Sequence, residues 1–358
     1  MAAGEQVVEL APGASPHGFD EYVERHPGGT LFHGSAWRDL VGRHFPAHRP
    51  RPLEAWRGGR RVGVLPLFET RSPLSGRALI SSPYAVYGGP LASDGAAARA
   101  LLDRVRAMVG GERLRFAELR LRDLDRSSGG AAAEYAGLPG SALYAAFERD
   151  LPVDPEECLA AIPRKSRAST RQARDRHRLE FHEDDGGRLD DFHRLFVRNK
   201  QRLGSPAFSR EWFADLLRLG RHRARLHVVS REGRMVAAAI SFLHRDTWNP
   251  YYSGADGDAD RLSASNFLYW QLMRAASAEG FRRFDFGRSR VDSGPFEFKR
   301  NMGFEPAPLP YRYVPGASGA IPSVNPGDRR FALPQRVIRS LPFALARAVG
   351  PALMRLVP

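Results

Sequence analysis

The spacing of apolar and polar positions predicts a chain in which helices and strands are mixed. Apolar residues recur every three or four positions in some segments and alternate with polar residues in others. The predicted helices cover residues 33–45, 95–109, 164–178, 189–203, 209–219 and 263–278, and the predicted strands cover 53–68 and 226–243 (each a hairpin), 114–121 and 281–286. Ser209 is a predicted N-cap, and Gly280 is a predicted helix end.

The two predicted hairpins resemble each other. Residues 57–62 and 231–236 share the pattern Arg-x-Gly-Arg-x-Val, and a phenylalanine follows six residues later in both, at Phe68 and Phe242. A helix and then an alternating strand come after each hairpin. The repeat indicates two copies of one α/β unit, although hairpin turns also resemble each other by chance. We therefore expect domains at residues 1–150 and 151–315, followed by a linker and an amphipathic tail at 316–358.

Composition narrows the class of protein. The 358 residues contain no apolar run of 18, so no transmembrane helix is predicted. Residues 1–10 lack the apolar stretch of a secretory signal, and a lone cysteine, Cys158, fits a reducing compartment. We expect a cytoplasmic protein. A lone cysteine forms no Cys-x-x-Cys pair, so no structural zinc site is expected.

The formal net charge of +14 permits anionic partners but does not identify one. The strongest basic concentration lies in the predicted helix 164–178, which begins with Arg164 and Lys165 and carries five more arginines. At helical spacing, several of them share one face that would suit phosphates or an RNA backbone. A solvated helix face is the alternative.

Lysine is rare in this chain. Of the 54 basic residues only three are lysines, and Lys299 lies beside Phe298 in an aromatic segment. Burial tunes the pKa of an ammonium, whereas arginine stays charged, so a retained lysine indicates chemistry. A lysine that snorkels at a strand end is the plainer interpretation.

Several nucleotide-binding and catalytic motifs are missing. The sequence has no Gly-x-Gly-x-x-Gly after a strand, no Walker loop and no Gly-x-Ser-x-Gly elbow. GNAT acetyltransferases hold the coenzyme A pyrophosphate on an Arg/Gln-x-x-Gly-x-Gly/Ala loop at a helix N-terminus. The literal matches, at 126–131 and 347–352, lie in a low-complexity loop and in the tail. We expect that an acyl donor is not held in the usual coenzyme A manner.

Two tyrosines, Tyr251 and Tyr252, lie at a predicted strand exit, and Asn266 follows in the next helix. Aromatic side chains with polar tips at a strand end suit a ligand pocket. Core packing explains them equally well.

These segments together resemble the FemAB/FemX family of non-ribosomal peptidyl transferases. The resemblance rests on Arg-Lys-Ser-Arg at 164–167, Tyr-Tyr-Ser-Gly at 251–254, Asp-Phe-Gly-Arg-Ser at 285–289 and Phe-Glu-Phe-Lys-Arg-Asn-Met-Gly-Phe at 296–304. FemAB-like proteins associated with exosortase/PEP-CTERM systems look closer still. The resemblance spans about residues 30–315 and implies an α/β (α+β) fold of two tandem GNAT-like domains, each a mixed sheet flanked by helices.

The resemblance also implies roles for individual residues. Lys299 matches the lysine near the reacting carbonyl and would stabilise the oxyanion or the donor ester. By its own chemistry, Asp285 is either the general base for the incoming ammonium or, equally well, a structural carboxylate paired with Arg288. The remaining expected substrate-binding residues are Tyr251, Tyr252, Asn266, Ser289, Phe298, Arg164 and Lys165, the last two for phosphates. No tightly bound cofactor is expected.

The sequence therefore predicts an N-acyl or aminoacyl transferase that modifies an amine on a cell-envelope sugar or peptide precursor. Acyl-CoA, an acyl carrier protein and aminoacyl-tRNA remain possible donors. A non-catalytic module that binds an anionic precursor or RNA is the alternative. The tail could hold the protein at the inner face of an anionic membrane, with Phe331, Ile338, Leu341 and Phe343 as anchors.

Overall fold

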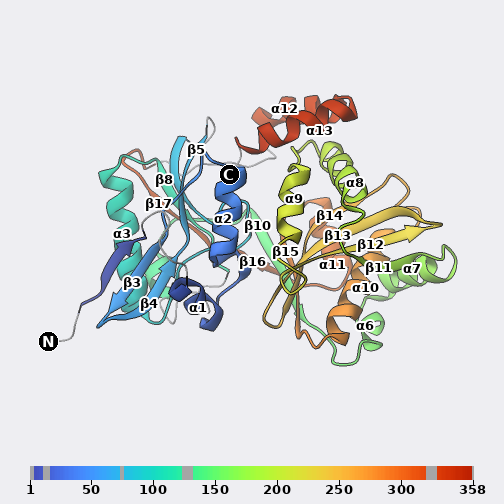
Figure 1. The fold of residues 1–358 in the computed structure, drawn as a ribbon, viewed down its shortest axis with the longest axis horizontal. Helices are drawn as coiled ribbons and strands as arrows, with labels where there is room; N and C mark the ends of the chain where they lie inside the picture. The colour runs from blue at the N-terminus through green and yellow to red at the C-terminus, as the bar shows by residue number, and fades with distance from the viewer. Residues whose placement is uncertain (1–3, 11–16, 73–75, 123–131, 320–328, 357–358) are drawn as a thin grey trace. The chain divides into compact units, whose positions relative to one another are not determined.

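The computed structural model describes residues 4–10, 17–72, 76–122, 132–319 and 329–356. The chain forms two compact units (Figure 1). Unit 1 comprises residues 1–143, 308–324 and 355–358, and unit 2 comprises 144–307 and 325–354. The mixture of helices and mixed sheets confirms the predicted fold class.

Unit 1 contains two sheets and a long helix. Their strand orders are β1-β3-β4-β7 and β2-β5-β6-β8-β17-β9. The elements are β1 (Gln6–Glu9), α1 (His17–Arg25), a 3-10 turn (Leu31–His33), α2 (Ser35–His44), β2 (Arg49–Pro50), β3 (Leu53–Arg57), β4 (Arg60–Leu65), β5 (Leu67–Ser72), β6 (Gly76–Ser81), β7 (Leu91–Ala92), α3 (Gly95–Gly111), β8 (Phe116–Leu119), α5 (Ala132–Ala136), β9 (Gly140–Ser141) and β17 (Tyr311–Pro315). The predicted helices at 33–45 and 95–109 correspond to α2 and α3.

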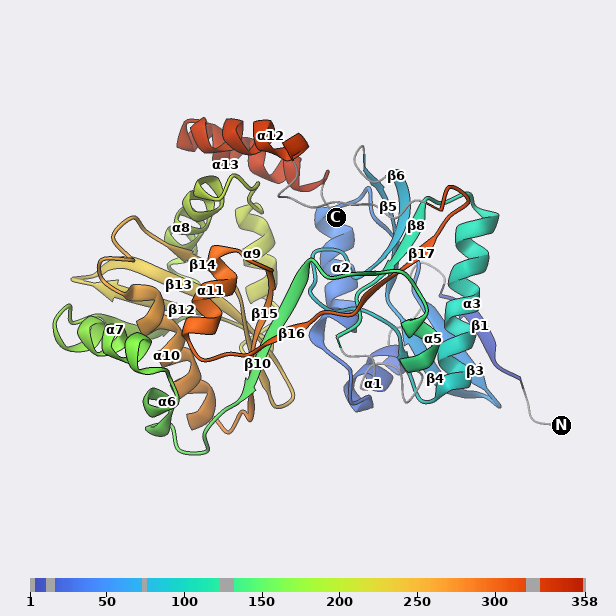
Figure 2. The same ribbon diagram turned by 180° about the vertical axis from the view of Figure 1, so that it is seen from behind.

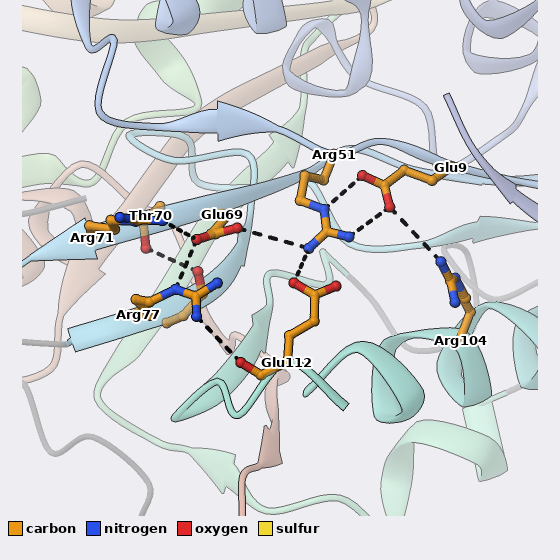
Figure 3. Close-up of polar contacts among 9 residues, drawn as sticks. Glu9, Arg51, Glu69, Thr70, Arg71, Arg77, Arg104 and Glu112 are labelled. Atoms are coloured by element: carbon orange, nitrogen blue, oxygen red, sulfur yellow. Dashed lines mark hydrogen bonds and ion pairs between the residues drawn. The ribbon is translucent and has the colours of Figure 1, made fainter. Parts of the chain in front are cut away.

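A network of ion pairs surrounds Arg51, at the edge of the core of unit 1 (Figure 3). Its guanidinium lies 2.7 Å from a Glu9 oxygen and 2.6 Å from a Glu112 oxygen, and Glu69 accepts from Arg77 at 3.0 Å. The hydrogen bond from Arg51 lowers the pKa of Glu9. The network joins β1, β5 and the residue that follows α3, which gives it a structural role.

Unit 2 is built on one seven-stranded sheet of order β11-β12-β13-β14-β15-β10-β16. Its elements are β10 (Tyr144–Asp150), α6 (Glu157–Ala160), α7 (Arg164–Asp175), β11 (Glu180–Asp184), α8 (Leu189–Arg202), α9 (Arg210–Leu217), β12 (Ala224–Arg231), β13 (Arg234–His244), β14 (Thr247–Ala255), α10 (Ala264–Ala278), β15 (Arg283–Arg290), α11 (Gly294–Asn301), β16 (Pro306–Pro308), α12 (Arg329–Ser340) and α13 (Phe343–Met354). The Ser209 side chain caps α9, and Gly280 has a left-handed φ of 82° after α10, as predicted.

The two hairpins have the same geometry. β3–β4 turns at Gly58-Gly59 and β12–β13 turns at Glu232-Gly233, and all four residues have positive φ. Such turns match the twist of antiparallel strands. Each hairpin also has a register shift two residues before its turn, at Ala55/Trp56 and at Val229/Ser230. The shared turn and bulge support the duplication inferred from the sequence.

The parallel strands β14 and β15 pair over a short length. Their pairs are Thr247 with Arg283 and Trp248 with Phe284. Two residues later on β14 is Pro250, which has no backbone N–H and cannot donate a hydrogen bond to a neighbouring strand. The Asn249 side chain instead donates to the carbonyl of Asp285 at 2.6 Å. The two strands are therefore open toward their carboxyl ends, where most of the predicted site residues lie.

The structure corrects two helix boundaries in the prediction. The basic helix α7 ends at Asp175, so Arg178 does not share its face, and Arg178 has a φ of 49° outside the helix. The segment after β15, for which no helix was predicted, contains the helix α11. Ser293 caps it and Pro295 stands at its start, a common beginning for a helix.

The amphipathic tail forms two helices. Pro334 and Pro351 lie inside α12 and α13, and Pro342 separates the two helices. Each internal proline removes one helical hydrogen bond. Packing against α8 compensates, because Ile338 and Leu341 lie beside Val197 and Gln201 of that helix. In both views α12 and α13 run side by side next to α8 (Figures 1 and 2).

Candidate active site

The most unusual group in unit 2 is the buried ammonium of Lys299 on α11. Its Nζ donates to three backbone carbonyls of β15, at 2.7 Å from Phe286, 3.3 Å from Gly287 and 3.1 Å from Arg288. It also lies 5.3 Å from the centre of the Phe147 ring. The position of α11 places the Lys299 side chain against the carboxyl end of β15. Its ammonium therefore lies beyond the point where the pairing of β14 with β15 ends.

Burial lowers the pKa of Lys299 to about 7. The negative charge of Asp285 opposes this shift, and the positive charge of Arg288 adds to it. A lysine with a pKa near neutrality changes its charge within the range where enzymes work, which is a common property of functional sites.

Asp285 immediately precedes the three residues of β15 whose carbonyls accept from Lys299, and Arg288 is the last of those three. Asp285 is almost fully buried, and its Oδ1 accepts from the Gly287 N–H at 2.7 Å. This bond fixes the carboxylate against its own strand. The Arg288 guanidinium is half-buried and lies 4.6 Å from the centre of the Tyr144 ring. Lys299 and Asp285 therefore form a coupled pair of opposite charges within one strand–helix unit.

Three buried polar atoms on β14 and β15 have no hydrogen-bond partner within the described part of the chain. They are Nε1 of Trp248 and Oδ1 of Asn249 on β14, and Oγ of Ser289 on β15. Buried polar groups in native proteins nearly always have partners, so such atoms commonly face a bound water or ligand. Asn249 was not predicted from sequence, although it immediately precedes the Pro-Tyr-Tyr motif.

Tyr251 and Tyr252 occupy different settings on β14. The register with β13 passes from Tyr252 to Pro250 and skips Tyr251, which is therefore the extra residue of a β-bulge. Bulges often occur next to active sites, where they redirect the backbone. Tyr252 packs among Phe196, Phe208 and Phe213, and its hydroxyl is 3.2 Å from Trp212 Nε1. Of the two alternatives, core packing describes Tyr252 better.

Asn266 and Phe298 lie beside the lysine segment. Asn266 Nδ2 on α10 is 3.3 Å from the sulfur of Met302, just after α11. The half-buried Phe298 packs near Tyr269 and Phe286, with ring centres 5.6 and 6.4 Å apart. Phe298 is thus part of the helix that carries Lys299, and Asn266 lies close to the end of that helix. The contacts described here for both side chains are with other residues of the protein.

Arg164 and Lys165 are exposed at the start of α7. That end of α7 is joined to the end of α11, because Ser166 Oγ donates to the Asn301 carbonyl at 2.6 Å. Pro163 packs tightly against Gly303 on the same side. The fold therefore places two unburied cations at the end of the helix that contains Lys299.

Lys200, on α8, was not among the predicted site residues. Its Nζ lies 5.3 Å from the Phe196 ring centre. Burial lowers the pKa of Lys200, and the charge of Arg288 lowers it further, so the two cations are near each other. The rarity of lysine in this chain was the signal that could have identified it.

The loop between β14 and α10 has acidic rather than glycine-rich chemistry. It contains Asp256, Asp258 and Asp260. Arg234 pairs with the first two of these, at 3.0 and 2.9 Å. Carboxylates at a helix N-terminus oppose the binding of phosphates, which otherwise favour such positions. Within the described ranges, no group of three His, Cys, Asp or Glu side chains could hold a metal ion.

Comparisons with known proteins agree with this geometry. Residues 162–300, which include β14, β15 and α11, match the family model described as an acetyltransferase (GNAT) domain. No match was found among curated protein sequences. Among the described helices, none has the length and apolar character needed to cross a bilayer.

Solved structures extend the likeness over most of the chain. FemX has a TM-score of 0.65 at 14% identity, with 86% of this chain and 97% of FemX covered. A tandem GNAT protein from the clavulanic acid biosynthesis pathway has a TM-score of 0.53 at 15% identity, covering 87% and 98%. The C-terminal domain of a putative lysylphosphatidylglycerol synthetase from Agrobacterium fabrum has a TM-score of 0.53 at 17% identity, covering 84% and 90%. The resemblance expected from sequence is thus confirmed at the level of the fold: the chain has a FemX-like tandem GNAT fold, and its residues 162–300 match the model of the GNAT acetyltransferase domain.

Proposed function

We propose that this protein transfers an acyl or aminoacyl group from an activated ester or thioester to an amine on a cell-envelope sugar or peptide precursor. The observation that carries the proposal is the buried Lys299 ammonium, which lies at the carboxyl end of β15 where that strand separates from β14. The GNAT domain match supports acyl transfer in general. The acceptor class rests on the sequence resemblance to peptidyl transferases.

The reaction requires an amine nitrogen to attack the donor carbonyl carbon. A C–N bond forms, the C–O or C–S bond to the donor breaks, and the amine loses a proton. The intermediate carries a negative oxygen, which a preorganised positive charge stabilises by about 10²-fold or more in rate. Lys299 supplies this charge. Because its three donors face backbone carbonyls, it acts on the oxyanion through its field.

We assign acceptance of the amine proton to Asp285, whose charge also favours the protonated form of Lys299. Asn249 Oδ1 and Ser289 Oγ are assigned to the substrate because they are buried without partners in the described chain. Arg288, Asn266, Phe298 and the bulged Tyr251 are assigned to the walls of the site. Arg164 and Lys165 are assigned to phosphates of the donor or acceptor.

The acidic loop before α10 favours a donor other than a coenzyme A thioester. Asp256, Asp258 and Asp260 stand where a pyrophosphate would need backbone donors and no negative charge. An aminoacyl-tRNA or an acyl carrier protein thioester carries its acyl group without presenting a pyrophosphate at this helix. We propose one of these two donors and no tightly bound cofactor.

The direct test offers each donor to the purified protein with an amine-bearing nucleotide-sugar peptide and measures the product by mass spectrometry. We expect the acceptor to gain the acyl mass with an aminoacyl-tRNA or an acyl carrier protein donor. Transfer from acyl-CoA alone would contradict the donor assignment. If the protein binds the acceptor but transfers nothing from any donor, the non-catalytic binding module is correct instead.

A further inference from the structure

The two tail helices present apolar side chains outward. Leu333 and Val337 of α12 are 71% and 49% exposed, and Leu345 and Val349 of α13 are 51% and 39% exposed. Each pair is four residues apart and therefore lies on one face of its helix. Only three other large apolar residues in the described chain are exposed to this degree: Val153, Leu203 and Leu356. Exposed apolar surface is thus concentrated on α12 and α13.

The outward direction of these residues does not come from a loose tail. Ile338, Leu341, Ala346 and Gly350 line the contact with α8 and the residues after it, and Val349 stands at the edge of this contact. Gly350 approaches so closely that an added Cβ would lie 3.0 Å from the Ala207 carbonyl oxygen. Gln201 of α8 also donates to the Leu341 carbonyl. The side of α12 and α13 that faces α8 is therefore packed against that helix. Leu333, Val337 and Leu345 lie on the side that this packing leaves exposed.

This arrangement changes which residues could anchor the tail. Ile338 and Leu341, expected from sequence to be anchors, face α8 and are wrong for that role. The half-buried Phe343 lies under the Arg198 guanidinium at 5.2 Å. The side chain of Phe331 is outside the described residues. The helical periodicity of the tail is genuine, but its most apolar positions are used in packing against α8.

The charge of the tail helices identifies the kind of partner. Residues 329–354 contain five arginines and no aspartate or glutamate. Arg336, Arg339 and Arg347 are exposed. The pKa of Asp190 on α8 is lowered by a hydrogen bond from Arg210 and also by the charge of Arg347. Arg339 lies beside Gly204 after α8, so Arg336 is the arginine next to the exposed apolar residues of α12. Exposed aliphatic side chains on helices with five arginines and no acidic residue match a surface with an apolar interior and anionic headgroups. A second copy of the chain would bring the same positive charges together, which disfavours self-association.

We propose that the face of α12 and α13 that carries Leu333, Arg336, Val337 and Leu345 binds the surface of an anionic lipid bilayer. This interfacial face inserts aliphatic side chains at the headgroup boundary while Arg336 contacts a lipid phosphate and the positive charge of the two helices attracts the anionic surface. The proposal is independent of acyl transfer, because a soluble donor and acceptor can react whether or not the protein is on a membrane.

The test is flotation of the full chain with phosphatidylcholine vesicles, with and without added phosphatidylglycerol. We expect flotation with the anionic vesicles only, and weaker binding as salt is raised. Leu333→Ser with Leu345→Ser should lower the vesicle partition coefficient by about tenfold or more. The matched control is Val153→Ser, which removes an exposed aliphatic side chain outside the tail and should bind as the parent does.

A charge variant makes the test independent of the leucine changes. Arg336→Gln should weaken binding to anionic vesicles by about fivefold. Thermal unfolding checks that each variant is folded. Absence of flotation, or equal flotation of the parent, the leucine double variant and Arg336→Gln, overturns the proposal. So does a dimer seen by light scattering that Leu333→Ser and Leu345→Ser dissociate, since a second copy would then cover the face.

Discussion

The Lys299 ammonium donates a 2.7 Å hydrogen bond to the carbonyl of Phe286, and so attaches α11 to the strand before it. Two further carbonyls, of Gly287 and Arg288, share the same ammonium. One lysine thus holds the end of β15 in place and brings a positive charge into a buried position. This double role leads to predictions for both activity and stability.

Replacement of Lys299 by methionine keeps the length and apolar stem of the side chain but removes the charge. We expect kcat/KM to fall by about 10²–10³-fold, since one oxyanion-stabilising group is worth about that much. Lys299→Arg, which keeps the charge, should retain more activity. Full activity in a folded Lys299→Met variant would exclude the mechanistic role.

The pH dependence follows from the pKa of Lys299, which is lowered to about 7. The protonated form stabilises the oxyanion, so its contribution is present below pH 7 and is lost as pH rises through 7. Arginine stays charged, so Lys299→Arg lacks this loss. We expect the ratio of parent to Lys299→Arg rates to fall between about pH 6 and 9, because ionisation of the acceptor amine cancels in the ratio. A constant ratio would contradict the charge-dependent role.

Asp285→Asn separates two functions of the carboxylate. An asparagine Oδ1 can still accept from the Gly287 N–H, but the charge that favours protonated Lys299 is gone. If Asp285 acts only through that charge, the alkaline loss of activity moves to lower pH and the acidic plateau is preserved. If Asp285 takes the amine proton, kcat falls by about 10²–10⁴-fold at every pH. The second outcome is the one we expect, and a rate profile measures it.

The lowered pKa of Lys299 should also make the free energy of unfolding depend on pH. Its pKa is about 7 in the folded protein, against an ordinary pKa of 10.5, so between these limits the unfolded chain binds more protons. Stability of the parent therefore rises with pH across this window, and the cost of the buried charge is greatest at and below pH 7. We expect the free energy of unfolding of Lys299→Met relative to the parent to decrease by a few kcal/mol (about 1.4 per pH unit) between pH 7 and 9.5. Denaturant titrations that give a pH-independent difference would contradict the lowered pKa.

Gly254 lets α8 approach β14 closely. An added Cβ would lie 2.7 Å from the Phe196 nitrogen and 2.8 Å from the Leu195 carbonyl carbon, which are backbone atoms and cannot move separately. We expect Gly254→Ala to lower the free energy of unfolding by about 1–3 kcal/mol, the usual cost of overpacking. A Cβ added at Gly257 would meet no atom within 4 Å, so Gly257→Ala serves as the control and should change stability little. Chemical denaturation of the two variants checks the contrast.

Local patterns in the sequence determined much of the fold. The amphipathic periodicity located α2, α3, α8, α9 and α10, and the glycine-containing turns located both hairpins. These features are local, because side-chain spacing and turn chemistry act over a few residues. The rarity of lysine and the aromatic residues beside it in the sequence identified Lys299 as a candidate functional residue without the structure.

Other features depended on contacts between distant segments. The separation of β14 from β15, the bulge at Tyr251 and the half-buried position of Lys200 arise from strand pairing and packing that spacing alone does not encode. The tail shows the difference most directly. The sequence showed that 331–358 is amphipathic, but docking on α8 decided that Ile338 and Leu341 face inward while Leu333 and Val337 face solvent. An apolar periodicity defines a face, and only the tertiary structure determines what that face meets.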